Sequence, residues 1–122
     1  MARALVLFAH GARAATWAAP FQALREQAQA RVPDCAVSLA FLELMTPSLA
    51  DEVESLLARG IADITVVPVF LGQGGHLLRD LPAIADQLRA AHPDLRLTVA
   101  GAVGEDPGVQ AAMAAYCVSA LG

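Results

Sequence analysis

The sequence predicts an α/β fold: a doubly wound, four-stranded parallel sheet of strand order 2-1-3-4 with helices on both faces. Apolar runs typical of buried strands alternate with helical patterns four times along the chain, and the connections are short. A proline also lies in or near the first turn of every predicted helix, where the N–H groups have no partner within the helix. The length of 122 residues indicates one domain spanning residues 1–122.

The predicted strands are residues 3–9, 36–42, 61–70 and 95–100. Pro68 lies inside the third strand and cannot donate to the ladder, so we expect this strand to bulge or lose pairing there. Right-handed crossovers place the third strand beside the first, on the side opposite the second. The winding therefore reverses between strands one and three, and ligands of open α/β sheets bind beyond the carboxyl ends of the strands at such a reversal.

The predicted helices are residues 17–31, 47–59, 81–91 and 107–121, because apolar side chains recur there at a period near 3.6 residues. Gly60 is expected to end the second helix. In the last helix the pattern predicts that three side chains face the core: Val109, Met113 and Tyr116. Short polar residues ahead of the later helices are the predicted N-caps: Thr46, Asp80 and Asp106.

Composition excludes several classes of function. The formal net charge is -4, which argues against nucleic acid or an anionic membrane as a partner. All eight basic residues are arginine, so a P-loop lysine and a Schiff-base lysine are excluded, and no G-x-G-x-x-G loop indicates a nucleotide. No apolar run reaches the roughly 18 residues needed to span a bilayer, and we expect a soluble, cytoplasmic chain. Cys35 and Cys117 lack C-x-x-C spacing and are predicted to be buried or half-buried.

Two strand ends each carry a histidine and an arginine beside glycine. The first strand leads into His10-Gly11-Ala12-Arg13, and the third leads into Gly72-Gln73-Gly74-Gly75-His76 followed by Arg79. In strand order 2-1-3-4, His10 and His76 flank the same crevice. Neutral imidazole is the commonest side-chain ligand of cobalt, nickel, zinc and iron ions. The sequence therefore predicts a two-histidine metal site, open enough to hand its metal on.

Other residues near this edge are candidates for a functional role, although each also has a purely structural explanation. Glu43 follows the second strand and is a candidate to complete the metal site or accept protons, against a solvated loop acid. Arg13 and Arg79 are candidates to bind substrate carboxylates, against plain solvent exposure. Gly74 and Gly75 suit the close approach of a flat ligand, although a tight turn also uses glycine. Trp17, near the same edge, is predicted to pack in the core rather than to contact a ring.

Four groups of residues at these spacings resemble the CbiX-type sirohydrochlorin chelatases over essentially the whole chain. They are His10-Gly11-Ala12-Arg13, Phe41-Leu42-Glu43 with Pro47-Ser48-Leu49, Val67-Pro68-Val69-Phe70-Leu71, and Gly74-Gly75-His76 with Asp80-Leu81-Pro82. The length resembles the short, single-domain form of the family, which works as a homodimer. One departure is Ala14-Ala15, where relatives often have a polar or acidic residue with proline.

The resemblance implies a lyase that inserts a divalent metal, usually cobalt, into sirohydrochlorin on the way to cobalamin. The two metal-binding histidines of the family map onto His10 and His76, and the glutamate after the second strand maps onto Glu43. The metal is then a substrate, and no nucleotide is required. Three alternatives remain open: nickel or iron chemistry of the same kind, a non-catalytic metal-delivery protein, and phosphoryl transfer through His10.

Overall fold

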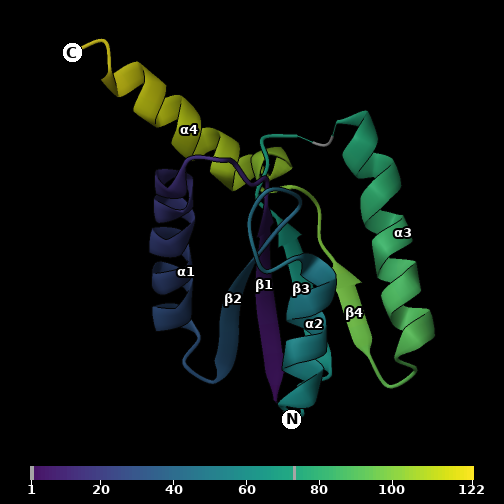
Figure 1. Cartoon of the computed structure of the whole chain (residues 1–122). Coiled ribbons are helices and arrows are strands. Elements are labelled where there is room, and N and C mark those ends of the chain that lie inside the picture. Colours follow the sequence, from purple (N-terminus) through teal and green to yellow (C-terminus); the bar gives the residue numbers. More distant parts are fainter. Residues whose placement is uncertain (1, 73) are drawn as a thin grey trace.

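The computed structural model describes residues 2–72 and 74–122, with the side chains of residues 75–78 outside that description (Figure 1). The strands are β1 (Arg3–Ala9), β2 (Cys35–Phe41), β3 (Asp63–Pro68) and β4 (Arg96–Val99). The helices are α1 (Ala19–Arg31), α2 (Leu49–Ala58), α3 (Gly75–Ala91) and α4 (Pro107–Ser119). Two short 3-10 turns, η1 (Ala15–Ala18) and η2 (Val103–Glu105), precede α1 and α4.

The four strands form one parallel sheet in the order β2-β1-β3-β4, which confirms the predicted topology. β1 is central and pairs with β2 along one edge and with β3 along the other. Its run of apolar residues fits a strand that is covered on both faces. The carboxyl ends of all four strands therefore point to one edge of the molecule.

Alternation along β1 sends its side chains to two separate cores. Val6 and Phe8 pack with α2 and α3, whose buried residues include Val53 and Leu81. Leu7 packs on the other face, in the core to which α1 contributes partly buried side chains. Helices on both faces confirm the predicted layering (Figure 1).

The start of α2 differs from the prediction. Thr46 is not the N-cap: α2 begins at Leu49, and the N-cap is Ser48, whose Oγ accepts a hydrogen bond of 3.1 Å from the N–H of Asp51. The reason is a backbone contact made before the helix, since the N–H of Phe41 donates to the carbonyl of Pro47 at 2.8 Å. This contact holds the chain beside the end of β2, so the helix starts only after it.

The start of α3 also differs. Gly74 is the N-cap and the helix begins at Gly75, so Asp80 and Pro82 lie inside it and Asp80 caps nothing. Proline in a helix interior removes one backbone hydrogen bond. Burial of Leu81, Ala85 and Leu88 in the core outweighs that loss, because tertiary packing supplies most of the stability of a helix.

Other boundaries agree more closely with the prediction. Gly60 has a φ of 82° and ends α2 as expected. Pro68 is the last residue of β3, so the strand is shorter than predicted. The expected bulge or loss of pairing at Pro68 is wrong on the β1 side, because Pro68 stays in register with Phe8 and the next residue, Val69, donates its N–H to the carbonyl of Phe8. Asp106 is the N-cap of α4, accepting hydrogen bonds from the N–H groups of Gly108 and Val109.

The position of α4 contradicts the prediction for its side chains. None of its 13 residues, all of which the structure describes, is buried. Tyr116 is 76% exposed, Val109 and Met113 are only half-buried, and Cys117 is exposed rather than covered. The cause is tertiary: α4 projects away from the sheet instead of lying on it (Figure 1). Among the described residues, no helix is long and apolar enough to cross a membrane.

Candidate functional site

The candidate site lies at the carboxyl edge of the sheet, where the loops after β1, β2 and β3 meet. Backbone hydrogen bonds continue past the ends of the strands and bring these loops together. The N–H of Leu42 donates to the carbonyl of Ala9 at 2.8 Å, and the N–H of Val69 donates to that of Phe8 at 2.7 Å. The residues that follow, His10, Glu43 and Phe70, are therefore held around the end of the central strand.

Gly11 lets the first two loops touch. A Cβ at this position would overlap the carbonyl oxygen of Glu43, and it would also crowd the backbone N of Met45. Because both neighbours are backbone atoms, neither can rotate out of the way. Gly11 is thus the glycine that the site requires sterically, whereas a Cβ on Gly72 or Gly74 would meet open space.

His10 and Glu43 form a polar pair at this edge. The Nδ1 atom of His10 lies 3.1 Å from Oε1 of Glu43, and the two side chains are 53% and 42% exposed. With Glu43 ionised, Nδ1 donates its hydrogen to the carboxylate, which leaves Nε2 with a free lone pair. A carboxylate on the far nitrogen is the usual orienting partner of a metal-binding histidine. The sequence offered Glu43 as a candidate to complete the histidine site, and the structure brings its carboxylate into contact with His10.

Two aromatic residues fix the position of His10. Its ring lies edge-on against Phe70, with ring centroids 4.5 Å apart and planes at 74°. The indole N–H of Trp17 donates to the backbone carbonyl of His10 at 2.7 Å. Trp17 is 41% exposed, so the prediction of a core residue was wrong: it packs on Phe21 along one side and faces solvent along the other.

Leu44 is a residue of this edge that the sequence did not reveal. It has a φ of 65°, and the N–H of Met45 donates to the carbonyl of Glu43 across it at 2.8 Å, which closes a three-residue turn. Such a φ at a leucine costs roughly 1–3 kcal/mol. The turn leaves the Leu44 side chain 63% exposed beside the polar pair. Leu71, which follows Phe70, is also exposed, at 76%.

The remaining predicted site residues are only partly placed. The His76 side chain lies outside the described residues, although its backbone is in the first turn of α3 together with Gly75. Arg13 and Arg79 are exposed, and so is Gly74. Within residues 2–72 and 74–122, apart from the undescribed side chains, no three His, Cys, Asp or Glu side chains gather as a metal-binding group.

Comparison with known proteins identifies the family. The CbiX family model matches residues 4–119. The chain belongs to the CbiX family. Among curated relatives, sirohydrochlorin cobaltochelatase of Methanocaldococcus jannaschii is 32% identical over 73% of this chain and 62% of its own length. The enzyme of the same name from Methanopyrus kandleri is 33% identical over 65% of this chain and 55% of its own. The chain thus spans less than two thirds of these relatives.

Solved structures of CbiX-type proteins share the fold. A CbiX protein from Marinobacter aquaeolei VT8 matches with a TM-score of 0.86 and 31% identity, covering 98% of this chain and 97% of that one. The sirohydrochlorin chelatase SirB from Bacillus subtilis subspecies spizizenii, in complex with cobalt, gives a TM-score of 0.76 at 26% identity. That match covers 87% of this chain but 45% of SirB, so this CbiX chain corresponds to about half of SirB.

Replacing Glu43 tests whether it orients His10. We expect Glu43→Ala to weaken cobalt(II) binding by about 10–100-fold, as for other partners of metal-binding histidines. Titration calorimetry with cobalt(II) measures the change. The matched control is Glu54→Ala. Glu54 Oε1 lies 3.7 Å from Nε2 of His92, so this substitution also takes a glutamate away from a histidine, but at a place outside the candidate site. Equal losses in both variants would contradict the assignment to Glu43.

Proposed function

We propose that this CbiX chain inserts a divalent metal, cobalt first among the candidates, into sirohydrochlorin. The His10–Glu43 pair supports the proposal most directly, because it offers a free imidazole nitrogen at the open edge of the sheet. The choice of sirohydrochlorin as substrate and of cobalt as metal is based on the curated relatives, which are named sirohydrochlorin cobaltochelatase. We propose His76, from the first turn of α3, as the second metal-binding histidine.

The proposed reaction exchanges ligands on the metal. The metal ion is a substrate, and Nε2 of neutral His10 holds it. The ring nitrogens of the tetrapyrrole then replace Nε2 as ligands of the ion. Two pyrrole N–H protons must leave as the metal enters, so metal and protons balance in charge. Glu43 is the proposed first acceptor, since its carboxylate is partly exposed and already lies beside the histidine. Solvent then removes these protons from the exposed edge.

The proposed binding of the tetrapyrrole uses its acidic rim and its flat face. Arg13 and Arg79 are exposed and available to its carboxylates, and the first N–H groups of α3, near Gly74 and Gly75, suit an anion. The flat face would lie on the exposed apolar side chains beside the histidine, above all Leu44. We propose a homodimer, because one domain of this size offers only one open edge to a large ring.

Spectroscopic assay of metal insertion tests the proposal. The protein is incubated with sirohydrochlorin and limiting cobalt(II), nickel(II) or iron(II), and the visible spectrum is followed against a control without protein. A rate above that control is expected, with cobalt fastest. If no metal gives acceleration while cobalt(II) still binds through His10, the protein is a metal-delivery protein instead.

Trp17 provides an independent test of where the ring binds. It is the only tryptophan, and it is attached to the backbone of His10 through its indole N–H. A tetrapyrrole bound at this edge absorbs near its emission, so we expect metal-free sirohydrochlorin to quench most of the fluorescence in a saturable way. Quenching that stays linear in ligand concentration, as with free tryptophan, would place the ring elsewhere.

A further inference from the structure

The sheet ends in two edge strands, β2 on one side and β4 on the other. The outer backbone groups of an edge strand have no neighbouring strand to pair with, so another chain can add a strand there. β2 is seven residues long and carries no charged residue, which makes its edge the more open to such addition. The groups that cover these backbone atoms therefore decide whether the sheet can be extended.

The side-chain amide of Gln29 covers the start of the β2 edge. Gln29 belongs to α1, which lies beside β2 (Figure 1). Its Nε2 donates to the carbonyl of Cys35 at 2.7 Å, and its Oε1 accepts from the N–H of Val37 at 3.0 Å. One donor and one acceptor facing an edge are what a paired strand would present. Gln29 thus takes the place of one residue of a fifth strand.

Other groups cover the remainder of the β2 edge. Nη1 of Arg25 donates to the carbonyl of Val37 at 3.4 Å. At the far end of the strand, the N–H of Phe41 donates to the carbonyl of Pro47 at 2.8 Å. Among the described residues, Leu39 is the one outward-facing position between them whose backbone has no such partner, and Leu39 is itself buried. A single position is too short to start a ladder.

The edge of β4 is covered in a similar way from α3. Nη2 of Arg89 donates to the carbonyl of Leu97 at 2.7 Å, and Nη1 of the same side chain is held by Oδ1 of Asp86 at 3.1 Å. The N–H of Arg96 donates toward β3, so alternation directs the backbone groups of Leu97 to the free edge. β4 is also only four residues long, and short edge strands resist addition.

We propose that these helix side chains close both edges of the sheet to strand addition by a second copy of this chain, with Gln29 as the main barrier. A second copy is the partner to be kept out, because it brings the same uncharged strand to an identical edge. Gln29 lies at the amino end of β2, whereas the candidate site lies beyond the carboxyl ends of the strands. This role is therefore separate from metal insertion and from the surface of the proposed homodimer.

Replacing Gln29 by alanine tests the proposal. The variant leaves the carbonyl of Cys35 and the N–H of Val37 open, so two copies can pair edge to edge. Light scattering should then show about twice the wild-type mass at the same concentration, since one open edge per copy pairs once. In dilute, unassociated protein the amide hydrogen of Val37 should exchange about 5–10-fold faster than in the wild type. It should become protected again when the variant associates.

Two matched variants separate edge pairing from other causes of association. Gln27→Ala removes another glutamine of α1, one that is exposed, and should keep the wild-type mass. Gln29→Glu retains an acceptor for the N–H of Val37, loses the donor to Cys35, and places a charge at the edge, which disfavours strand addition. It should lose stability as Gln29→Ala does and still keep the wild-type mass. Far-UV circular dichroism checks that every variant is folded.

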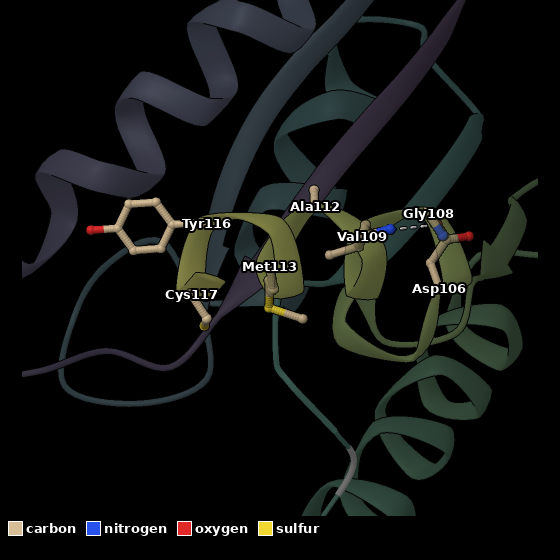
Figure 2. Close-up of a pocket in the computed structure, with 7 residues that line it drawn as sticks. All are labelled: Asp106, Gly108, Val109, Ala112, Met113, Tyr116 and Cys117. Atoms are coloured by element: carbon tan, nitrogen blue, oxygen red, sulfur yellow. Dashed lines mark hydrogen bonds between the residues drawn. The ribbon is translucent and has the colours of Figure 1, made fainter. Parts of the chain in front are cut away.

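The open hollow along α4 is a second possible source of association. It has a volume of about 690 Å³, and its lining includes Val109, Met113 and Tyr116 (Figure 2). The backbone groups of a helix are hydrogen-bonded within the helix, so this surface offers side chains and cannot pair with a strand. Substitutions at Gln29 leave it unchanged, and any association through it is therefore common to the wild type and the variants.

The other outcomes overturn the proposal. An unchanged mass of Gln29→Ala at every concentration shows that the edge stays closed without the amide. Equal association of Gln29→Glu shows that lost stability is the cause, and equal association of Gln27→Ala shows that the surface of α1 is the cause. Association without renewed protection of the Val37 amide places the contact away from β2. Metal insertion is assayed separately, so a failure of the proposed function is distinguishable from each of these results.

Discussion

Replacing His10 by alanine is expected to abolish metal insertion while the protein remains folded. Among the side chains that the structure describes at this edge, the imidazole of His10 is the one that offers a nitrogen lone pair and lies beside a carboxylate. Its loss should exceed the roughly 10–100-fold penalty that follows loss of a ligand's hydrogen-bonding partner. The side chain is 53% exposed, so its removal leaves no large cavity. The rate of cobalt insertion into sirohydrochlorin measures the effect.

His92→Ala is the matched control for this experiment. His92 caps the C-terminal end of α3, where it faces Glu54, and it belongs to the opposite end of the helix from the site. We expect full insertion activity in His92→Ala and none in His10→Ala, with His76→Ala behaving like the latter. Retention of more than about a tenth of the activity in His10→Ala would remove that residue from the mechanism.

Gly11→Ala is expected to destabilise the fold by about 2–3 kcal/mol, near the upper end for overpacking. The new Cβ would overlap the carbonyl oxygen of Glu43, and a backbone oxygen cannot move without shifting the whole turn around Leu44. Separation of the loops would also pull Glu43 away from His10, so activity should fall together with stability. Urea unfolding at equilibrium measures the loss.

Gly72→Ala separates this steric effect from a general effect of removing glycine. A Cβ on Gly72 meets nothing within 4 Å, and its φ is not in the left-handed region. The change in its unfolding free energy should therefore stay within about 1 kcal/mol, and a small gain is allowed because alanine restricts the unfolded chain. If Gly11→Ala were as stable as Gly72→Ala, the close approach of the two loops would be refuted.

The sequence alone predicts the sheet and the edge of the sheet that carries the candidate site. Alternating apolar runs and helical patterns predict the parallel order β2-β1-β3-β4, because connections of that length allow little else. The same order places the end of β1 at the reversal of winding, which makes His10 a candidate site residue from the sequence alone. These features depend on local periodicity and chain connectivity, which a sequence records directly.

Tertiary contacts decided the rest. The start of α2 at Leu49, with Ser48 as N-cap, follows from a backbone hydrogen bond between Phe41 and Pro47, which no residue type in this segment signals. The pairing of His10 with Glu43 depends on Gly11 and on the turn at Leu44, neither of which has a distinctive local pattern. Helical periodicity likewise predicted that α4 faces the core, whereas none of its side chains is buried. Periodicity shows which face of a helix is apolar, and only packing determines the surface that covers it.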